Sequence, residues 1–159
     1  DDAEVISMTK LLEDVVNEGR ALSLGRHVIT LEACRASLVG EPSDIRSAAM
    51  NLVSNAVRYT PEGGRIDVRW FRTSSGAVLS VKDTGIGIEE KHIPRLTERF
   101  YRVDKGRSRS TGGTGLGLAI VKHVCRSAGG QLKIESTPGK GSTFSMVFPK
   151  SRIFDDESV

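Results

Sequence analysis

The sequence predicts an α+β domain in which helices cover one face of a mixed sheet. Three segments carry apolar residues at steps of three and four, the spacing of helices with one buried face. Short apolar or alternating segments occur in pairs between them, and paired strands separated by helices are typical of α+β architecture. A chain of 159 residues is enough for one domain with a single core.

The three predicted helices differ in how clearly their ends are marked. The first spans residues 5–23, and the third spans residues 116–127. The second, at residues 43–59, has the most regular apolar pattern, and Ser43 or Asp44 can cap its N-terminus. These helices supply the predicted helical layer.

Strands are predicted wherever apolar residues alternate between turn signals. Residues 65–72 place Ile66, Val68 and Trp70 on one face, and a Ser-Ser-Gly turn then predicts a hairpin. The long segment 83–113 is irregular, with one short helix expected at 89–96. The predicted strands are residues 28–34, 37–39, 65–72, 78–81, 132–135 and 143–148.

Composition excludes several classes of protein. Hydrophobic residues make up 38% and charged residues 27% of the chain, and no apolar run approaches the ~18–20 residues that span a bilayer. Cys34 and Cys125 are far apart, so neither a disulfide framework nor a His/Cys metal site is predicted. The net charge of +3 is too small to indicate nucleic acid by itself. Basic residues gather at 99–109 beside glycines, which favours a phosphate-bearing ligand.

Three glycine-rich groups need an explanation, at residues 83–88, 112–118 and 139–142. Glycine lets the backbone approach a ligand closely, and the exposed amides of a helix N-terminus bind anions. Because the second group directly precedes a predicted helix, it is a candidate phosphate cradle. Neither the Rossmann fingerprint nor a P-loop is present, and plain turns are the alternative for each group taken singly.

A polar stripe borders the apolar face of the helix predicted at 43–59. Asn51 and Asn55 are four residues apart, and Arg58 and Tyr59 continue the same line. Amide oxygens can bind a hydrated Mg²⁺ ion that carries phosphates, Arg58 can pair with phosphate, and Tyr59 can stack on a flat ring. A solvated helix face is an equally good interpretation of the stripe alone.

Four motifs together resemble the ATP-binding catalytic domain of bacterial sensor histidine kinases. Residues 51–61 are similar to the N box of that family, 83–88 to the G1 box, 98–104 to the F box and 113–118 to the G2 box, in family order and spacing. The run 92–105 is similar to sensor kinases of the phosphate-regulon type. The resemblance covers most of the chain, and four ordered motifs are far more specific than one glycine motif.

This resemblance implies a Bergerat (GHKL) fold. That fold is a two-layer α/β sandwich, in which a mixed, mostly antiparallel sheet of about five strands is covered on one face by three helices. A long mobile ATP lid is expected at residues 97–113. The catalytic and ATP-binding domain is expected to span residues 1–149, with 150–159 as a polar, frayed tail. Asp1 in place of Met favours a piece of a longer protein.

The resemblance also implies roles for individual residues. Asn55 would hold Mg²⁺ with help from Asn51, Asp83 would accept the adenine amino group, and Gly87 would let the purine lie against the backbone. The implied catalytic residues are Asn51, Asn55 and Arg102. The implied residues for binding ATP are Asn51, Asn55, Arg58, Tyr59, Asp83, Gly85, Gly87, Ile88, Tyr101, Arg102, Gly113, Thr114, Gly115, Leu116, Gly117 and Leu118.

Two departures from related sequences refine the expected activity. Arg58 stands where the family usually has Lys, which keeps the charge but changes the geometry. Asn51 stands where chaperone, gyrase and mismatch-repair ATPases of this fold carry a Glu that activates water, so phosphotransfer with weak hydrolysis is expected.

The expected partners follow from what the sequence lacks. None of His27, His92 or His123 lies in the phosphoacceptor motif of the family, so the acceptor would be a His on a separate dimerisation domain. The cognate response regulator would be of the phosphate-regulon type. The resemblance implies the cytoplasmic part of a bacterial inner-membrane kinase, a monomer in isolation, with no nucleic-acid or membrane contact of its own. A nucleotide-binding regulatory module without phosphotransfer, and a basic nucleic-acid-binding domain using residues 99–109, are the alternatives.

Overall fold

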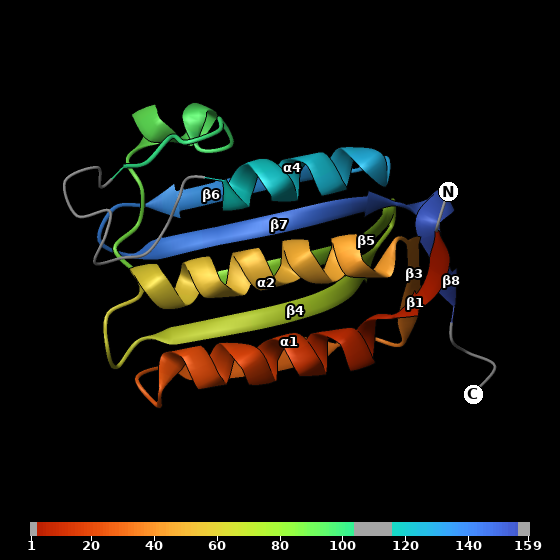
Figure 1. Ribbon diagram of the computed structural model, residues 1–159, viewed down its shortest axis with the longest axis horizontal. Helices are drawn as coiled ribbons and strands as arrows, with labels where there is room; N and C mark the ends of the chain where they lie inside the picture. The colour runs from red at the N-terminus through yellow and green to blue at the C-terminus, as the bar shows by residue number, and fades with distance from the viewer. Residues whose placement is uncertain (1–2, 104–115, 156–159) are drawn as a thin grey trace.

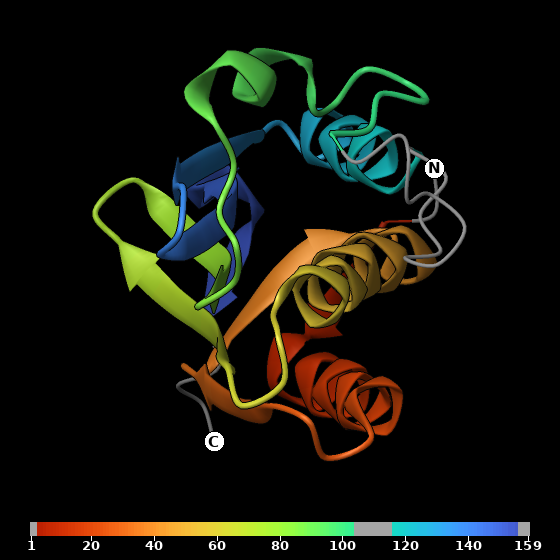
Figure 2. The same cartoon turned by 90° about the vertical axis from the view of Figure 1, so that its left-hand side faces the viewer.

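The computed structural model describes residues 3–103 and 116–155, and it has two layers (Figure 1). Three helices lie side by side on one face of a five-stranded sheet, as Figure 2 shows from the end. The helices are α1 (Met8–Ser23), α2 (Pro42–Tyr59) and α4 (Gly117–Ser127). The strands of the sheet are β2 (Val28–Ala33), β4 (Arg65–Thr73), β5 (Gly76–Asp83), β6 (Gln131–Thr137) and β7 (Gly141–Pro149). The predicted α+β sandwich is confirmed.

The sheet is mixed and mostly antiparallel, as predicted. Its order is β2-β4-β5-β7-β6, and only the β2–β4 pair is parallel. The chain leaves β2 and returns to β4 through α2, and such a crossover is what parallel neighbours require. The helix-facing residues of β4 are those that alternation predicted: Ile66, Val68 and Trp70 are at most 1% exposed.

A second, three-stranded sheet was not predicted. It has the order β1-β3-β8, formed by β1 (Glu4–Ser7), β3 (Ala36–Gly40) and β8 (Ile153–Asp155), and it lies at the right-hand end of Figure 1. Residues 5–7 are therefore strand, and the helix expected from residue 5 begins at Met8. The frayed tail expected at 150–159 is wrong for residues 150–155, because a short 3-10 helix (Lys150–Arg152) leads into β8, which pairs with β3. An Arg72–Asp155 ion pair also joins β8 to β4.

The helix α2 begins one residue earlier than predicted because a different residue caps it. The carboxylate of Glu41 accepts hydrogen bonds from the backbone N–H groups of Ser43 and Asp44, each at 3.1 Å. Pro42 occupies the first turn, where no N–H is needed. A negative charge also suits the positive end of the helix dipole. The prediction that Ser43 or Asp44 caps α2 is therefore wrong, although the start of the helix is right within one residue.

The segment after β5 is less regular than predicted. The helix expected at 89–96 is a 3-10 helix, η1 (Glu90–Arg95). It contains Pro94, which lacks an N–H and disfavours a continuing α-helix. The expected ATP lid at 97–113 is described only as far as residue 103. No helix in residues 3–103 and 116–155 is long and apolar enough to cross a membrane.

Trp70 ties the two sheets together, and its hydrogen bond gives a prediction about stability. Its indole N–H donates to the carbonyl of Ala36 on β3 at 2.9 Å, and its ring meets Phe148 edge to face. Trp70→Phe keeps most of the apolar volume but leaves that buried carbonyl unpaired. We expect the free energy of unfolding to fall by about 2 kcal/mol in urea titrations. A variant as stable as the wild type would show that this hydrogen bond contributes little.

Candidate functional site

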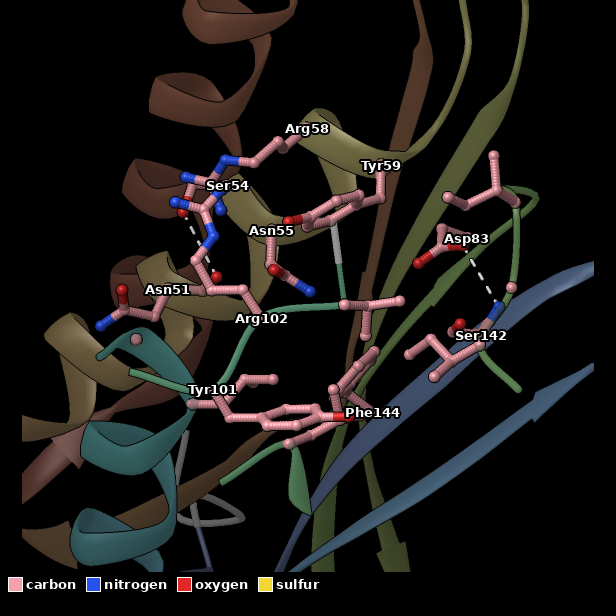
Figure 3. A pocket seen from close by; sticks show the side chains of 17 residues that line it. Asn51, Ser54, Asn55, Arg58, Tyr59, Asp83, Tyr101, Arg102, Ser142 and Phe144 are labelled. Carbon is pink, nitrogen blue, oxygen red and sulfur yellow. Dashed lines mark hydrogen bonds between the residues drawn. The ribbon is translucent and has the colours of Figure 1, made fainter. Parts of the chain in front are cut away.

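One cavity brings the predicted motifs together (Figure 3). It lies where α2 ends and α4 begins, and Figure 1 shows these points at the end of the molecule opposite the small sheet. It has a volume of about 200 Å³ and lies between the C-terminal half of α2, the end of β5, the start of α4 and residues 96–103. The predicted site residues that line it are Asn51, Asn55, Arg58, Tyr59, Asp83, Gly87, Ile88, Tyr101, Arg102, Gly117 and Leu118. Residues up to 93 positions apart in the sequence, from Asn51 to Phe144, thus line one site.

Other predicted site residues lie beside the cavity or outside the described part of the chain. Gly85 does not line it but donates its N–H to Asp83, and Leu116 is the residue that precedes α4. Gly113, Thr114 and Gly115 lie outside the described residues. The lining residues that sequence reasoning missed are Ser54, Ile86, Leu96, Val103, Ser142 and Phe144. Ser54, Ile86, Leu96 and Val103 lie inside segments that the sequence singled out, and Ser142 ends the third glycine group, whereas Phe144 lies in none of them.

The polar stripe of α2 forms one wall of the cavity. The side-chain N–H of Asn51 donates to the carbonyl of Ser47 at 3.0 Å, which leaves the amide oxygen turned toward the start of α4. A Cβ on Gly117 would lie 2.9 Å from that oxygen, so a larger residue there would displace the Asn51 side chain from its position. Asn55 lies over the cavity in Figure 3, and its side chain has no hydrogen-bond partner among the described residues. The stripe therefore lines the cavity with partly exposed side chains.

The described residues contain no cluster of three His, Cys, Asp or Glu side chains able to hold a metal ion. Two amide oxygens, those of Asn51 and Asn55, are the neutral hard ligands on the α2 wall. This donor set suits Mg²⁺, which keeps several waters and binds phosphate oxygens, better than a metal held by protein ligands alone. The residues thus fit a Mg²⁺ ion that arrives with a phosphate-bearing ligand.

Asp83 forms the opposite wall, at the C-terminal end of β5. The residue is 6% exposed, and its Oδ1 accepts N–H bonds from Gly85 at 2.8 Å and Ser142 at 3.2 Å. Figure 3 shows the carboxylate turned toward the cavity. Burial raises the pKa of Asp83 above its ordinary value, although the two backbone hydrogen bonds oppose the shift. The site therefore holds a buried acceptor at this end.

The raised pKa of Asp83 predicts how stability depends on pH. Because the folded chain binds this proton more tightly than the unfolded chain, the contribution to stability is complete below the ordinary pKa of 3.8 and is lost as pH rises through the raised value. Asp83→Asn is neutral at every pH. We therefore expect the free energy of unfolding of the variant, relative to the wild type, to increase as pH rises above 3.8. Denaturant titrations from pH 3.5 to about 7 measure this difference, and a constant difference would contradict the assignment.

The loop at residues 84–88 is held against the turn between β6 and β7. The carbonyl of Ile86 accepts from Gly139 N at 2.7 Å, and Ile88 N donates to the hydroxyl of Ser136 at 2.8 Å. Gly87 has a φ of +74°, and a Cβ there would overlap the carbonyl of Thr137. Gly87 is thus required by its conformation and by this close approach.

The charges in the cavity change sign from one end to the other. Asp83 marks the acidic end, whereas Arg58 and Arg102 line the α2 and α4 end. The N-terminus of α4 adds unpaired backbone amides and carries no acidic residue in its first turn. Such a site suits an elongated ligand with a hydrogen-bond donor at one end and an anion at the other.

Residues 96–103 cover the cavity and are anchored through Tyr101. The hydroxyl of Tyr101 is hydrogen-bonded to His92 Nδ1, and the guanidinium of Arg95 lies 4.4 Å from the centre of its ring. Arg95 in turn forms an ion pair with Glu98 at 3.1 Å. These contacts hold Tyr101, and with it the neighbouring Arg102, at the cavity edge.

Comparison with known proteins agrees with this geometry. Residues 40–152 match the family described as "Histidine kinase-, DNA gyrase B-, and HSP90-like ATPase". The phosphate regulon sensor protein PhoR of Pseudomonas aeruginosa is 52% identical over 158 residues, which are 98% of this chain and 36% of that protein. The sensor-like histidine kinase SenX3 of Mycolicibacterium smegmatis is 37% identical over 151 residues, 94% of this chain and 39% of that protein. The chain thus spans little more than a third of the length of these relatives.

A solved structure is similar over almost the entire domain. The mycobacterial sensor histidine kinase MprB matches with a TM-score of 0.82 and 30% identity, over 92% of this chain and 97% of that one. The sequence match, the fold and the cavity between α2, β5 and α4 lead to the same assignment. The chain belongs to the family of histidine kinase-, DNA gyrase B- and HSP90-like ATPases, as its four motifs predicted.

Proposed function

We propose that this chain is the catalytic, ATP-binding domain of a two-component sensor histidine kinase. It binds ATP·Mg²⁺ and donates the γ-phosphoryl group to a His on a separate dimerisation domain. The observation that carries the proposal is the change of charge along one cavity, from the buried Asp83 to Arg58, Arg102 and the N-terminus of α4. ATP has the matching arrangement, with an amino group on its base and a triphosphate at the other end.

Asp83 binds the adenine amino group in this proposal. One carboxylate oxygen is held by the N–H groups of Gly85 and Ser142, which fixes the side chain before the ligand arrives. A buried acceptor discriminates strongly, because a ligand without a donor leaves it unpaired. Tyr59, Ile88, Tyr101 and Leu118 line the same cavity and supply flat or apolar surface for the base.

The phosphates lie at the other end, between α2 and α4. Asn55, with Asn51 beside it, would hold Mg²⁺, and the ion when bound neutralises charge on the phosphate oxygens. Arg58 and Arg102 supply fixed positive charge, and the first amides of α4 supply hydrogen bonds. Gly113, Thr114 and Gly115 are proposed to extend this cradle. Phosphoryl transfer needs mostly positioning and charge neutralisation, which is what these groups provide.

Transfer to a protein side chain is favoured over hydrolysis by the chemistry of the α2 wall. A water molecule attacking the phosphate needs a general base, and the amide of Asn51 cannot serve as one. Among the described residues that line the cavity, Asp83 is the one carboxylate, and it belongs to the adenine end. We therefore expect slow hydrolysis of ATP and fast transfer once an acceptor is present.

The partners follow from the sequence relationships. The similarity to PhoR supports a cognate response regulator of the phosphate-regulon type and a full-length protein at the bacterial inner membrane, with this domain on the cytoplasmic side. The isolated domain is proposed to be a monomer that binds neither nucleic acid nor membrane.

Phosphotransfer to a separately produced acceptor domain tests the proposal. The chain is mixed with the dimerisation domain of its full-length protein and with ATP labelled at the γ-phosphate. Label on the acceptor that is acid-labile and disappears when the acceptor His is replaced by Gln is the expected result. Tight nucleotide binding without transfer would instead favour the alternative, a regulatory module that senses nucleotide.

A further inference from the structure

Two serine hydroxyls and Asp83 form a row across three strands. Ser136 on β6 lies opposite Ser142 on β7, and Ser142 lies opposite Asp83 on β5. The two hydroxyl oxygens are 2.7 Å apart, and Ser142 N donates to Asp83 Oδ1. Ser142 lines the cavity beside Asp83, whereas Ser136 is not among the lining residues.

The hydrogen bonds of Ser136 determine where the protons of this row lie. A serine hydroxyl has one hydrogen and two lone pairs. The oxygen of Ser136 lies 3.1 Å from the carbonyl of Gly141, which can only accept, so Ser136 donates its hydrogen there. One lone pair accepts from Ile88 N at 2.8 Å. The second lone pair of Ser136 remains for Ser142, so the arrangement that satisfies all three contacts has Ser142 as the donor between the two hydroxyls.

This order leaves Ser142 with lone pairs only toward the cavity. Because the Ser142 hydrogen is committed to Ser136, the adenine end presents two neighbouring acceptors, the Asp83 carboxylate and the Ser142 oxygen. An amino group at C6 of a purine has two hydrogens and can satisfy both acceptors. A carbonyl at C6 would face both with lone pairs, which is an unfavourable contact in a buried site.

We propose that Ser136 is a positioning residue for base specificity, which keeps the Ser142 hydrogen away from the ligand so that the site accepts 6-aminopurines and rejects 6-oxopurines. This inference rests on the nucleotide site proposed above. It extends the recognition of the base from Asp83 alone to a residue on another strand that does not touch the ligand.

Titration of ADP and IDP, both with Mg²⁺, tests the proposal. The two nucleotides share sugar and phosphates, and their bases differ in the C6 substituent and in the hydrogen that N1 of the oxo form carries. In Ser136→Ala the freed Ser142 hydroxyl can turn its hydrogen toward a C6 carbonyl. We expect the preference for ADP over IDP to shrink by ~10-fold relative to the wild type, the size of one net hydrogen bond. Ser136→Thr retains the hydroxyl and should restore the wild-type preference.

The control and the second variant separate specificity from loss of structure. Ser145→Ala removes a hydroxyl from the same strand as Ser142, at a position whose side chain is on the other face of the sheet, and it should leave the preference unchanged. A purely structural role for Ser136 would weaken ADP and IDP binding equally, and that result would overturn the proposal. Ser142→Ala removes the acceptor itself, so it must also shrink the preference for ADP over IDP. This second variant tests the proposal even where Ser136→Ala does not fold. A folded wild type that binds neither nucleotide would refute the proposed function instead.

Discussion

Asp83→Asn is expected to weaken the binding of ADP by ~100-fold or more, because it replaces a charged acceptor by an amide of the same shape. The amide oxygen can still accept from Gly85 and Ser142, so the loop at 84–88 keeps its support. The amide nitrogen then faces the adenine amino group, and donor meets donor in a buried site. Calorimetric titration with ADP and Mg²⁺ measures the loss.

A matched variant distinguishes the loss of the Asp83 contact from a general effect of removing one carboxylate. Asp14→Asn removes the same charge from the exposed face of α1, far from the cavity in sequence and fold, and it should bind ADP like the wild type. Folding is checked through the stability of Asp83→Asn at neutral pH, where removal of a buried charge favours the folded state. A folded Asp83→Asn that binds ADP within about threefold of the wild type would rule out the adenine contact.

Asn55→Ala is expected to remove the dependence of nucleotide binding on Mg²⁺ and to lower the rate of phosphotransfer by ~100-fold or more. The side chain lies over the cavity and has no hydrogen-bond partner among the described residues, so its loss breaks no hydrogen bond there. What it removes is the amide oxygen proposed to ligate the ion. Titrations with and without Mg²⁺, and transfer of label to the acceptor domain, measure the two effects.

Asn17→Ala is the matched control for this second prediction. Both substitutions replace Asn by Ala inside a helix, where Ala has the higher propensity, so neither should destabilise the fold through its backbone. Asn17 lies on the exposed side of α1, and its side-chain oxygen accepts a hydrogen bond from Arg20. Equal effects of the two variants on Mg²⁺ dependence would contradict a special role for Asn55.

The parts of the fold that could be predicted are those encoded by local periodicity. The apolar positions of α2, such as Ile45, Ala49 and Val53, repeat at helical spacing and are all buried. Ile66, Val68 and Trp70 occupy alternate positions of β4, and all three are buried on its helix-facing side. The polar stripe of α2 could be identified because it interrupts that regular pattern, and the structure shows that it faces the cavity.

The parts that could not be predicted depend on pairing between distant segments. β1 is four residues long and β8 is three, and both pair with the same strand, β3. Strands this short are too brief for an alternating pattern to mark either one. Ser142 and Phe144 reach the cavity because β7 pairs with β5, and register between strands cannot be derived from either sequence alone. The cap by Glu41 was missed for a similar reason, since glutamate is not among the preferred capping residues.

The central claim is that the cavity between α2, β5 and α4 binds an adenine nucleotide together with a Mg²⁺ ion. Titration of the chain with a non-hydrolysable ATP analogue, with and without Mg²⁺, tests this most directly. The account predicts one binding site per chain, with an affinity that rises when Mg²⁺ is present. A folded chain that shows no binding at millimolar nucleotide would contradict the account, and the basic segment at residues 99–109 would then have to be tested against nucleic acid.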